Sequence, residues 1–201
     1  MGMIYFWAFM DSEKAYDTID RHCMWQVPRV YGVRGKLLKD MPSIYAECIV
    51  CVRVRIDMSE WFPVNVRLRQ GCVMSPWLFN VYMDGVVREV NARVLGKGLE
   101  QLSVNGGRFE INQLVFADDT ALVADSEEKL CRLVSEFGRV FEKRKLRVNV
   151  VKSKVMRCSR YGNGGRRSNA CEPLKEVDCF KYLGSQLAAD GGCERDVVHD
   201  E

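Results

Sequence analysis

The chain has 201 residues, 47% of them hydrophobic and 28% charged, so its composition supports a folded core and excludes an intrinsically disordered chain. Its formal net charge of +3 permits a nucleic-acid partner without requiring one, because the 30 basic and 27 acidic residues are mostly interspersed. It contains no internal repeat, no secretory signal and no apolar run of the roughly 20 residues that cross a bilayer. We therefore expect an intracellular protein, nuclear or cytoplasmic, that is not secreted and does not enter a membrane.

The nine cysteines are odd in number and irregularly spaced, which makes a poor disulfide framework and fits a reducing compartment. The close pair Cys48 and Cys51 has no second pair at ligand spacing, and the histidines are His22 and His199 alone, so a zinc site is disfavoured. The pair lies in the run CIVCVRVRI, which is rich in β-branched residues, so we interpret both cysteines as residues of a buried strand.

The first half of the chain predicts strands and proline-interrupted helices. Its opening run MIYFWAFM is short, rich in aromatic residues and stopped by Asp11, which is typical of a buried strand. In chain order the predicted elements are a strand at 3–10, a helix at 12–33 interrupted by Pro28, a helix at 35–48 broken at Pro42, and hairpin strands at 48–57 and 61–71 around residues 58–60.

The second half contains the two clearest helices. In the first, Ser75 is a good N-cap and Pro76 a good first helical residue. The second has an acidic first turn, a basic last turn and an apolar stripe. The predicted elements are helices at 75–95 and 125–145, a loop at 96–107, strands at 108–117 and 146–151, and a short strand or turn at 180–187. This order predicts an α+β fold with helices packed on one face of an antiparallel sheet.

The stretch QLVFADDTALVA, residues 113–124, places Asp118 and Asp119 side by side within an apolar run. It predicts two short strands, 113–117 and 120–124, joined at the aspartates, so one interpretation is a solvated hairpin tip. The tip lacks the glycine or asparagine that tight two-residue hairpins prefer. The pair is therefore also a candidate for a role beyond turning the chain.

Adjacent carboxylates repel one another, which raises one pKa unless a cation neutralises them. Mg²⁺, a hard cation that prefers oxygen ligands, meets this need. A two-metal site for phosphoryl transfer requires a further carboxylate, and Asp11, which also ends a buried strand, is the candidate. We expect strand 4–10 to lie beside hairpin 113–124, which would bring Asp11 close to Asp118 and Asp119.

Five segments occur in the order of the palm motifs of reverse transcriptases: FMDSEKAYD, RQGCVMSPWLFNVYMD, FADD, LRVNVVKSK and FKYLGS. From about residue 5 to residue 195 the chain resembles the reverse transcriptases of non-LTR (LINE-type) retrotransposons. FADD alone would be a weak signal, whereas five motifs in order are specific. The resemblance implies a polymerase palm-like fold, with the fingers and thumb largely missing from this chain.

The resemblance gives roles to individual residues. Asp11, Asp118 and Asp119 would be the catalytic, metal-binding carboxylates for two Mg²⁺ ions, for which Mn²⁺ can substitute. Lys152 matches a catalytic lysine proposed to protonate the leaving pyrophosphate, although a basic loop residue is more often simply solvated. The implied partners are an RNA template, a DNA primer and dNTPs, while protein partners stay unknown.

Further motif residues would contact the substrates. Tyr16 has the position of the aromatic gate that excludes a 2′-hydroxyl, although by itself it indicates an ordinary helix-face aromatic. Gln70 and Gly71 begin the motif that lines the template and nucleotide pocket; glycine lets the backbone approach a ligand closely, while Gln70 alone indicates a surface residue. The residues that match the primer grip, or alternatively belong to a satellite core, are Phe180, Tyr182, Leu183 and Gly184.

We expect a partial palm domain at 1–159, a Gly-rich basic loop at 160–172, and a primer-grip-like segment with a truncated end at 173–201. The predicted function is two-metal nucleotidyl transfer by an RNA-directed DNA polymerase that extends a primer 3′-hydroxyl with dNTPs. The alternative is a catalytically inactive retrotransposon remnant with at most weak nucleic-acid binding through basic segments such as 142–154. A nucleotide cyclase is a more distant alternative, since RQGCVMSP and FKYLGS have no role there.

Overall fold

The computed structural model of the chain describes residues 4–46, 48–64, 67–69, 71–99, 101–104, 109–159, 171 and 173–195. Its helices are α1 (Ala15–Thr18), α2 (Arg21–Val30), α3 (Gly35–Asp40), the 3₁₀ helix η1 (Met41–Tyr45), α4 (Met74–Gly96) and α5 (Glu127–Lys143). Its strands are β1 (Ile4–Met10), β2 (Ile49–Val50), β3 (Arg53–Val54), β4 (Asp57–Met58), β5 (Phe62–Pro63), β6 (Leu102–Val104), β7 (Phe109–Ile111), β8 (Gln113–Phe116), β9 (Asp119–Ala124), β10 (Lys154–Ser159), β11 (Lys175–Glu176), β12 (Cys179–Tyr182), β13 (Ser185–Ala188) and β14 (Cys193–Arg195).

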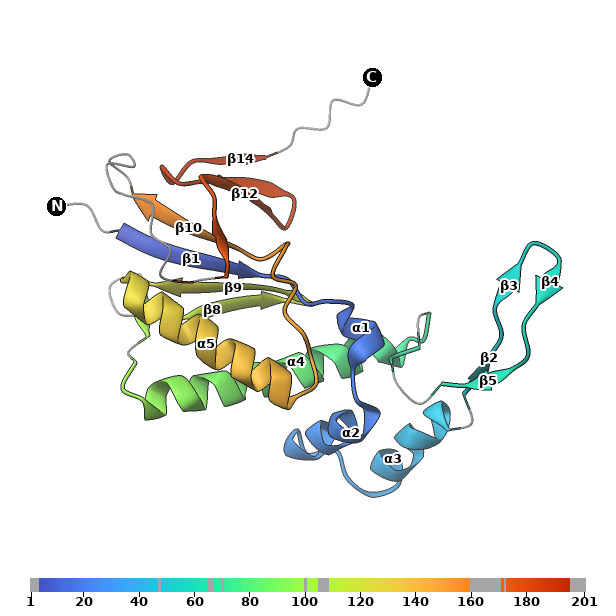
Figure 1. The fold of residues 1–201 in the computed structure, drawn as a ribbon. Coiled ribbons are helices and arrows are strands. Elements are labelled where there is room, and N and C mark those ends of the chain that lie inside the picture. Colours follow the sequence, from blue (N-terminus) through green and yellow to red (C-terminus); the bar gives the residue numbers. More distant parts are fainter. Residues whose placement is uncertain are drawn as a thin grey trace.

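A five-stranded sheet in the order β11-β10-β1-β9-β8 forms the centre of the fold (Figure 1). β1 lies antiparallel to both neighbours, with Phe9 opposite Lys154 of β10 and Met10 opposite Thr120 of β9. β9 pairs antiparallel with β8, whereas β11 pairs in parallel with β10. The first strand of the chain is therefore central, between two strands from the second half of the sequence.

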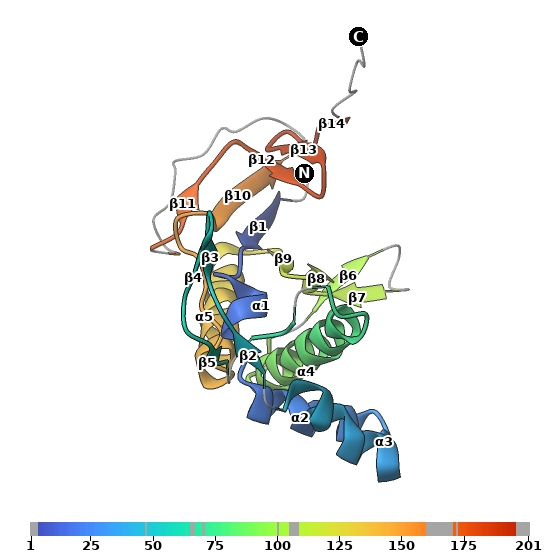
Figure 2. The ribbon, with the colours of Figure 1, turned by 90° about the vertical axis from the view of Figure 1, so that its right-hand side faces the viewer.

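Side chains that alternate along each strand give the central sheet two differently covered faces. Ala8 and Met10 of β1 belong to the main core, together with helix residues such as Phe137. Phe9 and Met156 belong to a second cluster, which the hairpin β12–β13 covers. Figure 2 shows the layers, with α4 and α5 on one side of the sheet and β12 to β14 on the other. The predicted α+β fold with helices on one face of a mostly antiparallel sheet is confirmed.

Both predicted long helices are confirmed as α4 and α5. Ser126 caps α5, where its side chain accepts from the Lys129 N–H at 3.3 Å. Ser75, predicted to cap α4, lies inside the helix instead, and its hydroxyl donates to the Arg69 carbonyl at 2.7 Å. The prediction fails because Ser75 also shares a hydrogen bond of 2.8 Å with the buried Tyr45 hydroxyl, so tertiary contacts engage the serine.

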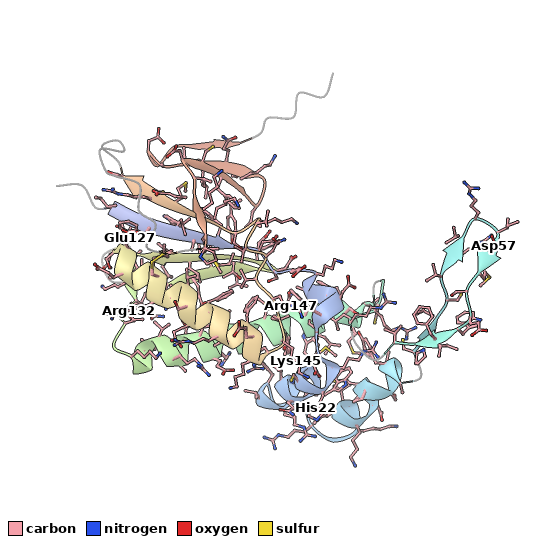
Figure 3. The ribbon with its side chains drawn as sticks, viewed as in Figure 1. His22, Asp57, Glu127, Arg132, Lys145 and Arg147 are labelled. Carbon is pink, nitrogen blue, oxygen red and sulfur yellow. A yellow bond between two sulfur atoms is a disulfide. The ribbon has the colours of Figure 1, made fainter. Side chains whose placement is uncertain are left out.

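Strands β2 to β5 form a hairpin arm that projects from the rest of the fold, with Asp57 near its far end (Figure 3). β2 pairs with β5 and β3 with β4, so the predicted hairpin is confirmed, although β5 covers only Phe62–Pro63 of the strand predicted at 61–71. Its turn lies at residues 55–56 rather than 58–60, and Arg55 there has a positive φ of 56°. The arm is largely exposed, as the 88% exposure of Ile56 shows.

Two further local predictions are wrong. Pro28, predicted to interrupt a helix, lies inside the ten-residue α2, and the break comes earlier, between α1 and α2. Because Pro28 stands near the end of α2, it disturbs few helical hydrogen bonds. Residues 146–151, predicted as a strand, are no strand; Val148 forms an isolated bridge with Ser12, and a turn then leads into β10.

The cysteines also depart from expectation. Cys131 of α5 and Cys171 are joined by a disulfide across a sequence separation of 40, so the expected absence of disulfides is wrong for this pair. Irregular spacing hides such a pair because the fold, not the sequence, brings the two sulfurs together. Cys48 and Cys51 are half-buried rather than buried in a strand. No described helix is long and apolar enough to cross a membrane.

Two phenylalanines test the assigned core. Phe137 of α5 has no exposed surface, whereas Phe116 at the end of β8 is 63% exposed. We predict that Phe137→Ala lowers the free energy of unfolding by about 3–5 kcal/mol, because it leaves a cavity in the main core. Phe116→Ala, the matched control, should change it by less than about 0.5 kcal/mol. Urea unfolding followed by circular dichroism measures both free energies. Equal losses for the two variants would contradict the assignment of Phe137 to the main core.

Candidate active site

The turn between β8 and β9 carries the adjacent aspartates. Phe116 pairs with Asp119, so the turn residues are Ala117 and Asp118, and Asp119 already belongs to β9. The predicted turn at both aspartates is therefore wrong by one residue. Ala117 takes a positive φ of 52°, which a two-residue hairpin turn requires and which glycine usually supplies. The sequence gives no sign of this shift because alanine has no preference for that conformation.

The register of the central sheet brings Asp11 beside this turn. Met10 is opposite Thr120, so one residue further Asp11, directly after β1, comes opposite Asp119, the first residue of β9. Alternation puts Asp11 on the same face as Phe9, away from α4 and α5. The expected pairing of the first strand with the aspartate hairpin is thereby confirmed.

Asp119 lies near two other negatively charged carboxylates, those of Asp118 and Asp11. Partial burial, followed by the charges of Asp118 and Asp11, raises the pKa of Asp119 above its ordinary value, and the positive charge of Lys152 opposes that rise. Lys152 is exposed in the turn 149–152, where its N–H donates to the Asn149 Oδ1 at 3.2 Å. These charged groups therefore interact at one end of the sheet.

A pocket of about 320 Å³ opens at this end of the sheet. Its charged lining consists of Asp11, Asp119, Lys152 and Lys181. The other lining residues are Phe9, Met10, Thr120, Phe180 and Tyr182. The pocket thus combines carboxylates and ammonium groups with an aromatic wall.

The aromatic wall is held on the sheet by ring contacts. Phe180 stacks on Phe9 with ring centroids 4.3 Å apart, and Tyr182 lies against the same ring at 5.6 Å. Burial and then the charge of Asp119 raise the pKa of Tyr182. The β12–β13 hairpin is therefore fixed directly beside the carboxylates.

Tyr16 of α1 stands next to the turn, outside the lining of this pocket. Its ring stacks on Phe79 of α4 with centroids 4.4 Å apart. Burial and then the charge of Asp118 raise the pKa of the Tyr16 hydroxyl, so Asp118 acts on both Tyr16 and Asp119. The Tyr16 carbonyl accepts from the Leu68 N–H at 2.8 Å, which ties α1 to the segment before α4.

The other predicted residues that the structure describes do not line this pocket. Gln70 lies outside the described residues. Gly71 is exposed at a φ of 78°, a conformation that favours glycine, with open space where a Cβ would stand. Leu183 and Gly184 form the turn between β12 and β13, with φ values of 49° and 80°.

The carboxylate oxygens are suitable ligands for a divalent cation, although the side chains are not already arranged around a metal-binding position. Within the described part of the chain, no group of three or more His, Cys, Asp or Glu side chains is arranged to hold a metal ion. Mg²⁺ usually takes one or two protein carboxylates and completes its shell with water and phosphate oxygens. Asp11 and Asp119 line the same pocket and can supply such donors.

Sequence reasoning missed Phe9 and two serines near the aspartates. Phe9 makes both ring contacts with the β12–β13 hairpin, and strand alternation, which puts positions 9 and 11 on one face, is the signal that points to it. Ser12 and Ser153 are buried beside Asp11. Both lie inside the motifs FMDSEKAYD and LRVNVVKSK, but no local pattern marks their hydrogen bonds, because the partners are main-chain groups far along the chain.

Asp119 and Asp20 predict opposite pH dependences of stability. The raised pKa of Asp119 means that its ionisation, above the unfolded-state pKa of ~3.9, destabilises the fold. The Lys145 hydrogen bond lowers the pKa of Asp20, whose stabilising effect is present at neutral pH and is lost on acidification through that lowered pKa. We predict that Asp119→Asn raises the free energy of unfolding at neutral pH, whereas Asp20→Asn lowers it, and that both differences shrink in acid.

Urea unfolding at neutral and acidic pH measures both effects. Asparagine keeps the acceptor that caps α2, so the Asp20→Asn control isolates the charge. If Asp119→Asn had the same free energy of unfolding as the wild type at neutral pH, that result would contradict the conclusion that burial and neighbouring negative charges destabilise ionised Asp119.

Comparison with known proteins identifies the family. Residues 5–187 match the family described as "Reverse transcriptase (RNA-dependent DNA polymerase)". The chain is 23% identical over 199 residues to a retrovirus-related Pol polyprotein from the type-1 retrotransposable element R2 of Popillia japonica, covering 94% of this chain and 32% of that protein. It is 25% identical over 199 residues to the polyprotein from the type-2 element R2DM of Drosophila melanogaster, covering 92% of this chain and 18% of that protein.

A solved structure with the same fold is the telomerase of Candida Tropicalis in complex with a TWJ fragment of telomeric RNA, with a TM-score of 0.72 and 11% identity over 99% of this chain and 31% of that one. The chain thus spans about a third or less of the length of these relatives. The resemblance of the sequence motifs is confirmed. The chain belongs to the reverse transcriptase (RNA-dependent DNA polymerase) family, in the group found in non-LTR retrotransposons.

Proposed function

We propose that this domain catalyses nucleotidyl transfer, extending a DNA primer 3′-hydroxyl with dNTPs on an RNA template. The observation that carries the proposal is that Asp11 and Asp119 line one pocket at the end of the central sheet, with Asp118 in the adjoining turn. The family supplies the reaction class.

Asp11, Asp118 and Asp119 would hold two Mg²⁺ ions, for which Mn²⁺ can substitute. When bound, the ions would act as Lewis acids toward the 3′-hydroxyl and would neutralise charge on the phosphates. The raised pKa of Asp119 supports this assignment, because a divalent cation removes the repulsion that its carboxylate neighbours exert.

Lys152 would act on the leaving group. The reaction joins the primer 3′-oxygen to the α-phosphorus of the dNTP, breaks the bond from that phosphorus to the β-phosphate oxygen, and releases the hydroxyl proton and pyrophosphate. Lys152 lines the same pocket as Asp119 and has an exposed side chain, so its ammonium group can donate a proton to the pyrophosphate.

Tyr16 and the β12–β13 hairpin would seat the substrates. The stacking of Tyr16 on Phe79 restricts the tyrosine ring, which suits a gate that excludes a 2′-hydroxyl. Phe180 and Tyr182 are held by Phe9 beside the carboxylates, which suits a platform for the primer end.

The other assignments in the proposal follow from the resemblance. Gln70 and Gly71 would line the template and nucleotide pocket, and Leu183 and Gly184 would complete the primer grip. We also propose an intracellular location, nuclear or cytoplasmic, and a division into a palm segment at 1–159, a basic loop at 160–172 and a primer-grip segment at 173–201.

The alternative, an inactive remnant with weak nucleic-acid binding, depends on basic segments such as 142–154 and 159–167, and residues 160–167 lie outside the described residues. In the segment 142–154 Lys143 and Arg144 pair with Glu89 at 2.6 and 2.9 Å, and Lys145 pairs with Asp20 at 2.5 Å. These ion pairs reduce the positive charge that the segment offers to phosphates. We therefore favour the enzyme over the remnant.

Primer extension tests the proposal. Purified protein with a primed RNA template, dNTPs and Mg²⁺ should extend the primer, and the double variant Asp118→Ala, Asp119→Ala should lower the rate at least about 100-fold, because it removes the charges that the reaction requires. Asp125→Ala is the matched control, since Asp125 follows the opposite end of β9 and pairs with Lys129 at 2.9 Å.

Two results would count against the enzyme. Equal primer extension by the wild type and the double variant would contradict the assignment of Asp118 and Asp119 to the active site. Absent extension, together with salt-sensitive and sequence-independent RNA binding that the double variant retains, would favour the inactive remnant instead.

Sugar selection gives a separate prediction. Tyr16→Ala should raise the incorporation of ribonucleotides relative to deoxyribonucleotides by about tenfold or more, because it removes the ring that would exclude the 2′-hydroxyl. Tyr31→Ala, which changes a 37% exposed tyrosine after α2, should leave the ratio unchanged. Single-nucleotide incorporation assays with ATP and dATP measure the ratio, and an unaltered Tyr16→Ala ratio would exclude the gate.

A further inference from the structure

Asp11 stands one residue beyond β1, yet both of its main-chain polar groups are bonded. Its N–H donates to the Ser153 Oγ at 3.0 Å, and its carbonyl accepts from the Asn149 N–H at 2.9 Å. The turn 149–152, which carries Lys152, therefore closes around the Asp11 main chain. Ser153 has no exposed surface, so its contact is shielded from water.

Ser12 makes a contact toward the other aspartates. Its hydroxyl donates to the carbonyl of Asp118, in the turn between β8 and β9, at 3.3 Å. Ser12 is 6% exposed, and its main chain bridges to Val148. A continuous chain of contacts thus runs from Ser153 through Asp11 and Ser12 to Asp118.

The two hydroxyls act on main chain rather than on substrate. Neither Ser12 nor Ser153 belongs to the lining of the pocket beside Asp119. Ser153 accepts a hydrogen bond from the N–H of Asp11, and Ser12 donates one to the carbonyl of Asp118. These contacts fix the main chain from which the two carboxylate side chains extend. A metal or catalytic site tolerates displacements of only about 0.5 Å in its ligands, so such contacts affect binding.

We infer that Ser12 and Ser153 are positioning residues, which hold Asp11 and Asp118 at a fixed separation and thereby set the affinity of the site for a divalent cation. The inference rests on the proposed function, because it takes the aspartates as ligands of that cation. The ligand class is a hard divalent cation, either Mg²⁺ or Mn²⁺.

The test measures Mn²⁺ binding to the purified chain by electron paramagnetic resonance, without nucleic acid. Ser12→Ala and Ser153→Ala should each raise the Kd for Mn²⁺ by about tenfold, because loss of a group that orients a ligand typically costs 10–100-fold in metal affinity. Ser12→Thr keeps the hydroxyl and should return the Kd toward the wild-type value. Ser135→Ala is the matched control, since the exposed Ser135 donates to the Cys131 carbonyl on α5 at 2.8 Å.

Circular dichroism and thermal unfolding separate positioning from folding. If Ser153→Ala unfolds at the assay temperature, Ser12→Ala and Ser12→Thr decide the test. Folded alanine variants that bind Mn²⁺ as tightly as the wild type would overturn the inference, even if they melt earlier. A wild-type chain that binds no Mn²⁺ would overturn it as well.

The failure of the proposed function is distinguishable from failure of the inference. If Asp118→Ala and the serine variants all weaken Mn²⁺ binding while the wild type extends no primer, the inference stands and the polymerase proposal fails. If the wild type extends primers and the serine variants bind Mn²⁺ normally, the polymerase proposal stands and the inference fails.

Discussion

The antiparallel register between β1 and β9 is the constraint on which the site depends. With Met10 opposite Thr120, Asp11 comes opposite Asp119. Because side chains alternate along a strand, a slip of one residue would turn Asp11 toward α4 and α5 and bury a carboxylate in the main core. Ala8 and Met10, which belong to that core, oppose the slip. Burial of apolar side chains on one face of the sheet therefore fixes the position of the charged carboxylates at the end of the other face.

The same register explains why the β12–β13 hairpin lies over the carboxylates. Phe9 precedes Asp11 by two positions, so the ring that Phe180 stacks on and the carboxylate share one face. This cover removes part of Asp119 from water, and burial is the largest cause of its raised pKa. The raised pKa means that the ionised form of Asp119 destabilises the domain, and a cation bound as we propose would neutralise that charge. Under that proposal, stability and cation binding are opposed at the same residues.

Sequence patterns predict these elements where the determinants are local. The acidic first turn of α5 and the strand that ends at Asp11 are visible in the sequence, and the ends of the two strands suffice to nominate the aspartates. Prediction fails where a partner is distant: Tyr45 engages Ser75, and Cys131 bonds Cys171 across a separation of 40. Long-range main-chain contacts, such as those of the buried serines, leave no periodic trace at all.

Ala117 illustrates how the fold holds an unfavourable local conformation. A non-glycine residue at a φ of 52° costs roughly 1–2 kcal/mol relative to a right-handed conformation. The β8–β9 ladder on both sides of the turn, together with the Ser12 contact to the Asp118 carbonyl, opposes relaxation of that strain. Glycine would adopt the same φ without strain, but it would also leave the turn free to adopt others. The lack of glycine, which makes the stretch a poor hairpin by sequence rules, therefore suits a turn that holds a carboxylate in one position.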